Sequence, residues 1–207
     1  MDERLDVLDD DLQVIGQEYR KAVHEQEWLH AAFQCWLYMY RNGIPYLFFQ
    51  VRNARVNYPN LLDITVGGHL KAGEGPEEGS REMKEEVGLE VPFAELTPLG
   101  IIRDTLQQPN GKQDRECCYV YAYHYKRDIT ELRINPDEVA GIVCLPMDDF
   151  KQILERNDHH YRTEALTYQG NQIRTQSLNL TIKDFVPHTE AYYEFVLDHL
   201  SQLHNAK

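Results

Sequence analysis

Residues 67–89, which read GGHLKAGEGPEEGSREMKEEVGL, constrain the structure of this chain more than any other segment. The stretch 76–87 predicts a helix, because proline suits a first helical turn and the acidic residues after it suit the positive helix N-terminus. On this helix Glu82, Glu85 and Glu86 are spaced i, i+3 and i+4, so three carboxylates share one face. Like charges at this spacing repel each other, and the helix therefore needs either a cation between them or full contact with water.

A divalent cation is the simplest way to relieve this repulsion. Mg²⁺ and Mn²⁺ take oxygen ligands, and Mg²⁺ typically combines a few carboxylates with waters and substrate phosphates. A solvated acidic face is the alternative that the pattern alone leaves open. The cation interpretation predicts a metal site that recruits a substrate carrying phosphate.

The rest of the chain predicts a mixture of strands and helices, which favours an α/β sandwich over a bundle or a barrel. Asn42-Gly43 separates two strand-forming runs and is a typical β-hairpin turn. Residues 1–27 are expected as an N-terminal extension, either an arm or a short strand pair. Residues 157–187 are expected as a loop that leads into a closing helix within 157–207. The expected strands are 28–40, 44–51, 61–66, 99–103, 116–125 and 139–145, and the other expected helices are 147–156 and 189–203.

The charge of the chain restricts its partners. Its 34 acidic and 21 basic residues leave a net charge of −13, which argues against general binding to nucleic acid or to an anionic membrane surface. No apolar run reaches the roughly 18 to 20 residues that span a bilayer. The acidic start differs from a signal peptide, and the four cysteines show no CxxC pair. These features predict a cytoplasmic chain, 1–207, that forms one large domain.

Residues 67–89 also resemble the signature box of the Nudix hydrolase family. In that box a glycine is followed by five residues, a glutamate, seven residues and then Arg-Glu-hydrophobic-x-Glu-Glu-x-Gly-hydrophobic. Gly68 and Glu74 match the first part, and residues 81–89 match every defined position of the second. Six residues rather than seven separate Glu74 from Arg81, which predicts a shortened loop or first helical turn. A group of isomerase-like hydrolases shares this shorter spacing.

The resemblance implies a Nudix α/β/α sandwich around a mixed β-sheet, with the box (67–89) as a loop-helix-loop. It also implies hydrolysis of a diphosphate bond by attack of water on phosphorus, with Mg²⁺ or Mn²⁺ as cofactor. Glu82, Glu85 and Glu86 would ligate the metal, with Glu85 or Glu86 best placed. Arg81 would orient the glutamates through charge-assisted hydrogen bonds, and Gly68 would allow the backbone to approach the site closely.

The family box does not fix the catalytic base. A helical glutamate, Glu116 and Glu138 are the candidates, and ordinary surface charge is the alternative for Glu138. For the basic residues around the expected pocket, contact with phosphate oxygens and a solvated surface are equally supported. The predicted substrate-binding residues are Gly68, His69, Arg52 and Lys71, and the predicted substrate is a small organic diphosphate.

A wider similarity covers most of residues 5–150 and points to the branch of the family that contains isopentenyl-diphosphate isomerase. In that isomerase three histidines and two carboxylates bind one metal. The corresponding residues here are His24, His30, His69, Asp114 and Glu116. Imidazole and carboxylate ligands would suit Zn²⁺ or Mn²⁺. Structural hydrogen bonding by the histidines is the alternative.

The isomerase also needs a cysteine two residues before the third histidine, where this chain has Gly67. Its box lacks parts of the hydrolase pattern, whereas residues 81–89 are complete here. Both differences favour hydrolysis of a nucleoside-diphosphate-linked or other organic diphosphate. Two alternatives stay open, namely a nucleotide-sensing or interaction module with this fold and no turnover, and an isomerase that works without the cysteine. The resemblance is also compatible with a homodimer.

Overall fold

A computed structural model of the chain describes residues 3–156, 158–169 and 172–205. In these residues nine strands form one mixed sheet with the order β11-β10-β9-β4-β3-β8-β7, in which β5 pairs with β4 and β6 pairs with β3. The strands β3 and β8 run parallel. The bounds are β3 (His30–Arg41), β4 (Ile44–Arg52), β5 (Leu62–Ile64), β6 (Val66–His69), β7 (Thr97–Gln107), β8 (Gln113–His124), β9 (Val139–Pro146), β10 (Tyr161–Gln169) and β11 (Gln172–Leu180).

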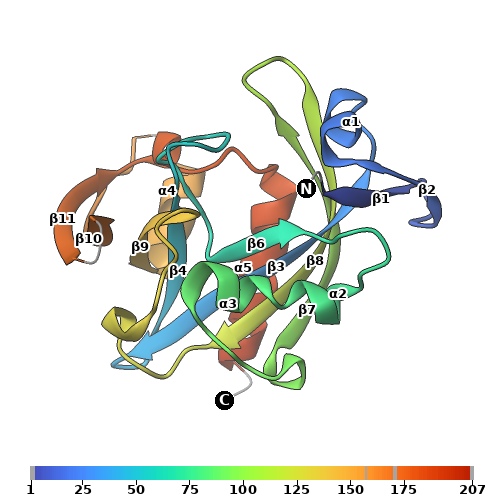
Figure 1. Ribbon diagram of the computed structural model, residues 1–207. Coiled ribbons are helices and arrows are strands. Elements are labelled where there is room, and N and C mark those ends of the chain that lie inside the picture. Colours follow the sequence, from blue (N-terminus) through green and yellow to red (C-terminus); the bar gives the residue numbers. More distant parts are fainter. Residues whose placement is uncertain (1–2, 157, 170–171, 206–207) are drawn as a thin grey trace.

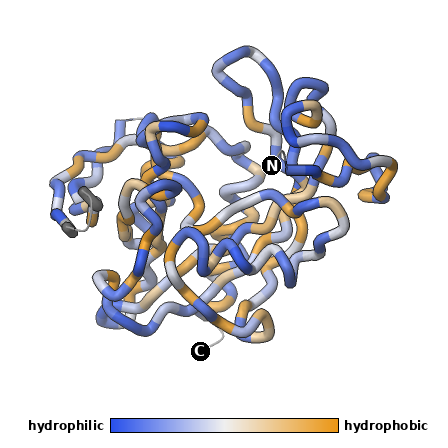
Figure 2. Tube along the Cα trace, in the orientation of Figure 1, coloured by the Kyte–Doolittle hydropathy of each residue, from blue (hydrophilic) through white to orange (hydrophobic). Residues whose placement is uncertain are grey.

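Helices cover both faces of the sheet, as Figure 1 shows. On one face Met83 and Val87 belong to the same buried cluster as Phe33 and Leu37, and on the other Tyr192 belongs to a cluster with Trp36 of the same central strand. Hydrophobic residues are concentrated in these strands and hydrophilic ones in the outer loops (Figure 2). The α/β sandwich predicted from the sequence is confirmed. The helices are α1 (Arg20–Glu25), α2 (Pro76–Gly79), α3 (Glu82–Val87), α4 (Met147–Glu155) and α5 (Glu190–Asn205).

Two predictions about local structure are wrong. The expected loop 157–187 contains a long antiparallel hairpin, β10 and β11, in which Tyr161 pairs with Leu180. Its residues 174–177 are exposed, so the strand lacks the apolar alternation that marks a half-buried strand. The expected helix 76–87 is two short helices, α2 and α3, separated at residues 80–81. Among the described residues, no helix combines the length and the apolar character needed to cross a membrane.

The N-terminal residues form a short strand pair, which is one of the two structures expected for residues 1–27, the other being an arm. The strands β1 (Arg4–Leu8) and β2 (Val14–Tyr19) lead directly into α1. Leu5, Val7 and Val23 bury one another in a small cluster. The backbone N–H of Ala72 donates a hydrogen bond to the Arg4 carbonyl at 2.8 Å, which attaches the pair to the loop after β6. This packing holds α1 beside the end of β6.

The sheet forks in its middle. Strands β3 and β4 pair near their hairpin, up to Tyr38 opposite Leu47. Beyond that point β3 pairs with β6 and β4 pairs with β5, so that two arms diverge. Thr65 lies at the branch between β5 and β6, and its hydroxyl accepts a hydrogen bond from Leu37 N–H at 3.1 Å and donates one to the Phe48 carbonyl at 2.5 Å. One buried side chain therefore joins the backbones of both arms.

Replacing this side chain by one of similar shape tests its role. Thr65→Val is expected to lower the free energy of unfolding by about 1–3 kcal/mol, because it leaves a buried N–H and a buried carbonyl without partners. Thr65→Ser keeps the hydroxyl and loses only a methyl group, which costs about 1 kcal/mol. Urea denaturation of both variants measures the difference. A valine variant that is more stable than the serine variant would contradict this role.

Candidate active site in the forked sheet

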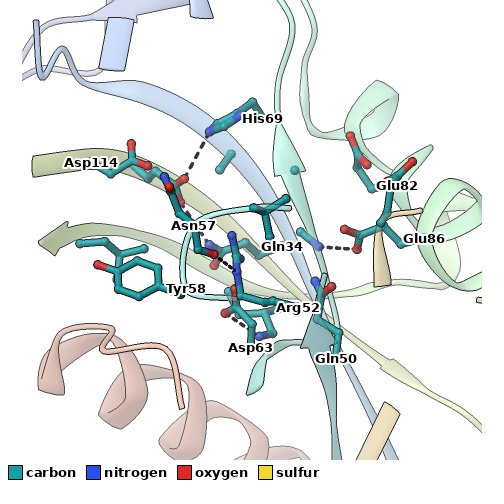
Figure 3. A pocket seen from close by; sticks show the side chains of 18 of the residues that line it. Gln34, Gln50, Arg52, Asn57, Tyr58, Asp63, His69, Glu82, Glu86 and Asp114 are labelled. Atoms are coloured by element: carbon teal, nitrogen blue, oxygen red, sulfur yellow. Dashed lines mark hydrogen bonds and ion pairs between the residues drawn. The ribbon is translucent and has the colours of Figure 1, made fainter. Parts of the chain in front are cut away.

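A cavity of about 680 Å³ lies between the two arms of the fork (Figure 3). Its walls come from β3, β4, β5 and β6, and from α1, α3 and β8. It brings together eleven of the site residues predicted from the sequence, whereas His30 lies outside the lining and contacts the rings of two lining histidines. The eleven are Arg52, Gly68, His69, Lys71, Arg81, Glu82, Glu85, Glu86, His24, Asp114 and Glu116.

One wall carries the glutamate cluster, which consists of Glu82, Glu86 and Glu138. One oxygen of each carboxylate lies within 4.8 Å of the others. Glu86 Oε2 accepts a hydrogen bond from the Gly67 N–H at 3.0 Å. A Cβ atom on Gly68 would lie 2.5 Å from the Glu82 carboxyl carbon, so a side chain at this position would displace the Glu82 carboxylate. The backbone of β6 therefore lies directly against two carboxylates of the cluster.

Glu138 enters this cluster through contacts that the sequence does not reveal. The Asn135 N–H donates to the Glu86 carbonyl at 2.9 Å, and the Asn135 side-chain amide donates to Glu138 Oε1 at 3.0 Å. The turn before β9 is thereby attached to the end of α3. Glu85, by contrast, has a side chain that is 48% exposed and pairs with Arg81 at 3.9 Å. The structure thus groups Glu86 with Glu82 and Glu138 and leaves Glu85 on the cavity wall beside Arg81, and the expectation that Glu85 or Glu86 is the best-placed metal ligand stays a prediction.

Burial makes the charge of this cluster unfavourable without a cation. Burial raises the pKa of Glu82 to about 7, although the guanidinium of Arg81 opposes the shift. Burial and the neighbouring Glu82 raise the pKa of Glu86 well above its ordinary value. Arg81 reaches Glu82 at 3.0 Å and Glu74 at 3.5 Å, so the shortened loop still brings Glu74 to the same guanidinium. A divalent cation would supply the positive charge that the cluster lacks.

A second group on the cavity, the histidine cluster, consists of His24, His30, His69, Asp114 and Glu116. Its three rings lie with centroids 4.8 to 5.1 Å apart. Asp114 Oδ1 lies 3.4 Å from His24 Nε2 and 3.6 Å from His30 Nε2, and Glu116 Oε1 lies 3.5 Å from His69 Nε2. His30 and Glu116 are register partners in the parallel β3–β8 pair. The sheet therefore positions four of the five side chains, and α1 supplies His24.

The donor atoms of this cluster fit a metal ion. His30 Nδ1 lies 3.0 Å from the Trp28 carbonyl and so carries the proton, which leaves a lone pair on Nε2. That nitrogen and Asp114 Oδ1 are both buried without a hydrogen-bond partner among the described residues. Burial lowers the pKa of His30 to about 4 and that of His69 to about 3, so both rings are neutral. Asp114 raises the pKa of His24, so a proton on that ring competes with a metal.

The predicted phosphate-binding residues differ in how firmly they are held. Arg52 forms an ion pair with Asp63, and its Nε–H donates to the Asn57 carbonyl at 2.8 Å. Lys71 is exposed, and its backbone N–H donates to Glu74 at 2.9 Å. Contact of Arg52 and Lys71 with phosphate stays a prediction.

Sequence reasoning missed a buried charged group behind Arg52. His188, in the segment before α5, has Nδ1 at 2.5 Å from Asp104 Oδ2 and Nε2 at 2.8 Å from Asp63 Oδ1. Burial alone would lower the pKa of His188, but the hydrogen bonds and charges of the two carboxylates raise it to about 9. The positions 63, 104 and 188 share no local pattern, so only the fold reveals the group.

The forked sheet and the glutamates of its loop-helix-loop define the class of fold, and comparisons with known proteins identify the family. A family model described as the NUDIX domain matches residues 13–166, and the chain belongs to this family. An uncharacterised Nudix hydrolase of Clostridium acetobutylicum is 34% identical over 95% of this chain and 96% of its own length.

Other relatives place the chain in the isomerase-like branch. The isopentenyl-diphosphate Delta-isomerase of Klebsiella pneumoniae strain 342 is 30% identical over 85% of this chain and 94% of its own length. The crystal structure of DR0079 from Deinococcus radiodurans matches with a TM-score of 0.54 and 26% identity, and the match covers 70% of this chain and 85% of that one.

Proposed function

We propose that the protein hydrolyses a diphosphate bond in a small organic diphosphate with the help of Mg²⁺ or Mn²⁺. The observation that carries this proposal is the convergence of Glu82, Glu86 and Glu138 in the cavity, with their oxygens within 4.8 Å of one another. A divalent cation held there would bind phosphate oxygens and stabilise the negative charge that develops on them. Membership of the Nudix family supports hydrolase activity in general.

The proposed reaction is the attack of water on one phosphorus atom. The water oxygen forms a bond to this phosphorus while the bond from the phosphorus to the bridging oxygen breaks. The bridging oxygen leaves with the other phosphoryl group, and a carboxylate of the cavity takes a proton from the water. A carboxylate that ligates a cation is a poor proton acceptor, so Glu85, which lines the cavity outside both clusters, is the first candidate for this base, and Glu116 and Glu138 are candidates only if they do not ligate metal.

Other residues of the site have supporting roles in this proposal. Arg81 holds the Glu82 carboxylate in place and partly offsets its charge. Gly67 donates to Glu86, which leaves the other oxygen of that carboxylate for the cation. Arg52 would contact phosphate oxygens from the β4 arm, and Lys71 would contact them from the exposed rim of the cavity. The histidine cluster would hold a second ion, Zn²⁺ or Mn²⁺, beside the substrate.

Isomerisation of a diphosphate is the second candidate, because the Klebsiella pneumoniae isomerase is 30% identical. Among the described residues no cysteine lines the cavity. The four cysteines are all buried, and Gly67 has no side chain that could exchange a proton with carbon. The composition of the cavity wall therefore favours hydrolysis.

A direct assay tests the proposal. The purified protein is incubated with Mg²⁺ or Mn²⁺ and a panel of nucleoside diphosphates, nucleotide sugars and prenyl diphosphates, and the products are separated by chromatography. We expect cleavage of at least one compound, incorporation of oxygen from labelled water into one product, and loss of activity with a chelator. No cleavage of any compound, or cleavage that the chelator leaves intact, would contradict it. Deuterium exchange into isopentenyl diphosphate would instead indicate isomerisation.

A further inference from the structure

Two buried glutamines contact the two carboxylates of the histidine cluster. Gln34 on β3 is 3% exposed, and Gln108 in the turn between β7 and β8 is 8% exposed. Both side chains line the cavity, and Gln34 is labelled in Figure 3. An amide has one end that donates and one that accepts, so its orientation decides what it offers to a neighbour. The other contacts of each glutamine determine which end faces the cluster.

Gln108 holds the carboxylate of Asp114. Its amide nitrogen donates to Asp114 Oδ2 at 2.8 Å, and its amide oxygen accepts from the Asn57 side chain at 2.5 Å. An ionised carboxylate only accepts hydrogen bonds, so the nitrogen of Gln108, and not its oxygen, faces Asp114. The other oxygen, Oδ1, is left 3.4 Å from His24 Nε2 and 3.6 Å from His30 Nε2.

Gln34 holds the carboxylate of Glu116 in the same way. The indole N–H of Trp36 donates to the Tyr192 hydroxyl oxygen at 3.1 Å, so the hydroxyl proton is directed to the amide oxygen of Gln34, at 2.6 Å. The amide nitrogen of Gln34 is then the end that donates to Glu116 Oε2, at 3.5 Å. The other oxygen, Oε1, lies 3.5 Å from His69 Nε2.

The two carboxylates are therefore arranged alike. In each of them an amide nitrogen binds one oxygen, and the second oxygen faces the imidazole nitrogens of the cluster. Asp114 Oδ1 is buried and has no hydrogen-bond partner within the described part of the chain. Hydrogen bonds to the carboxylates that bind a metal orient these ligands, and their removal typically weakens metal binding roughly 10- to 100-fold.

We propose that Gln34 and Gln108 are positioning residues, which turn Glu116 and Asp114 so that one oxygen of each is directed at an ion held by the three histidines. Tyr192 and Asn57 act one step further away by fixing the two amides. This inference rests on the proposed function only in assigning an ion to the histidine cluster, and it is independent of the hydrolysis of any diphosphate. Without the amides the carboxylates are ordered only when the ion binds, which lowers its affinity.

Zinc binding to the metal-free protein, in the absence of substrate, tests this inference. Competition with a chromophoric chelator measures the Zn²⁺ affinity of the unaltered protein, Gln34→Met and Gln108→Met. Methionine keeps the approximate size of glutamine and removes both hydrogen-bonding groups. The matched control is Gln107→Met, at the exposed neighbouring position. We expect the affinity to fall at least about tenfold in the first two variants and to stay within about twofold in the control. His69→Gln, which removes a proposed ligand, identifies the zinc bound at this cluster.

A pair of tyrosine variants separates positioning from a general loss of stability. Tyr192→Phe removes the hydroxyl that fixes Gln34. Tyr193→Phe removes the neighbouring buried hydroxyl, which donates to the Val186 carbonyl at 2.6 Å. Urea denaturation is expected to show a loss of stability in both variants, because each loses a buried hydroxyl. Only Tyr192→Phe is expected to weaken zinc binding, by at least about threefold, and to shift the visible absorption bands of bound Co²⁺.

The possible results distinguish this proposal from the proposed function. Unchanged zinc affinity in either glutamine variant, an equal loss in the two tyrosine variants, or no zinc binding that depends on His69 overturns the positioning role. Weakened zinc binding without turnover of any diphosphate supports the positioning role and overturns hydrolysis. Turnover with unchanged zinc affinity in the variants supports hydrolysis and overturns the positioning role. Should a glutamine variant fail to fold, the comparison of Tyr192→Phe with Tyr193→Phe decides.

Discussion

Glu86→Gln is expected to lower kcat/KM for the diphosphate substrate at least about a hundredfold, because even residues that only support metal ligands typically contribute 10- to 100-fold. Glu86 lies in the glutamate cluster and is 7% exposed. Glutamine has the same shape but carries no charge, so the cation is held less well. The measurement is a Mg²⁺ titration of the initial rate of hydrolysis.

The same substitution lowers the activity but is not expected to lower the stability of the protein. The pKa of Glu86 is raised because its charge is unfavourable in the buried site. Removing that charge without metal present should therefore leave the protein at least as stable to urea as before. The control is Glu95→Gln, an exposed glutamate outside the cavity, which is expected to retain full activity. Activity of Glu86→Gln within tenfold of the unaltered protein would exclude Glu86 as a metal ligand.

His188→Gln is expected to lower the free energy of unfolding by about 3–5 kcal/mol near neutral pH, the usual cost of removing one partner from a buried ion pair. His188 is 9% exposed, and the substitution would leave the carboxylates of Asp63 and Asp104 buried with no cation between them. Urea denaturation in the presence of a chelator measures this loss. The exposed His160→Gln serves as the control and is expected to stay within about 0.5 kcal/mol.

The pH dependence of this loss distinguishes a charge effect from a packing effect. Because the pKa of His188 is raised from 6.5 to about 9, its contribution is complete below pH 6.5 and is lost as the pH rises through 9. This shift of the pKa from 6.5 to about 9 corresponds to about 3 kcal/mol of the free energy of unfolding. The pKa values of Asp63 and Asp104 are lowered by His188, so their contribution is present above about pH 4 and is lost as the pH falls further.

The difference in stability between the unaltered protein and His188→Gln should therefore shrink between about pH 7 and pH 10. The raised pKa of Glu82 also makes the folded state less favourable as the pH rises. Both proteins contain Glu82, so its effect cancels when one free energy of unfolding is subtracted from the other. An equal difference at both ends of this range would show that packing, and not charge, is what His188 contributes.

Local patterns predicted the parts of the fold that depend on neighbouring residues. The Asn42-Gly43 turn and the amphipathic helix near 189–203 were both recovered, because the turn type and the helical period are encoded within a few residues. The exposed strand β11 was missed because its partners, not its own pattern, make it a strand. The break at residues 80–81 was missed although the shortened spacing of the box was visible.

The residues of the site also divide into those that a local pattern predicts and those that only long-range contacts reveal. Glu82 and Glu86 could be found from their spacing on one helix, and the histidine cluster from the resemblance. Glu138 was only one candidate base, with ordinary surface charge as the alternative, and His188 was not found at all, because hydrogen bonds between distant segments bring both to the cavity. Such contacts leave no periodic signal in a single sequence.

The parallel pairing of His30 with Glu116 has a consequence for how the molecule forms. These two residues lie far apart in the sequence, so their pairing closes a long loop of chain. The closure of long loops slows the folding of a polypeptide. A slip of one residue in that ladder would turn Glu116 to the opposite face. The histidine cluster is thus expected to take its observed arrangement only after this long-range pairing has formed.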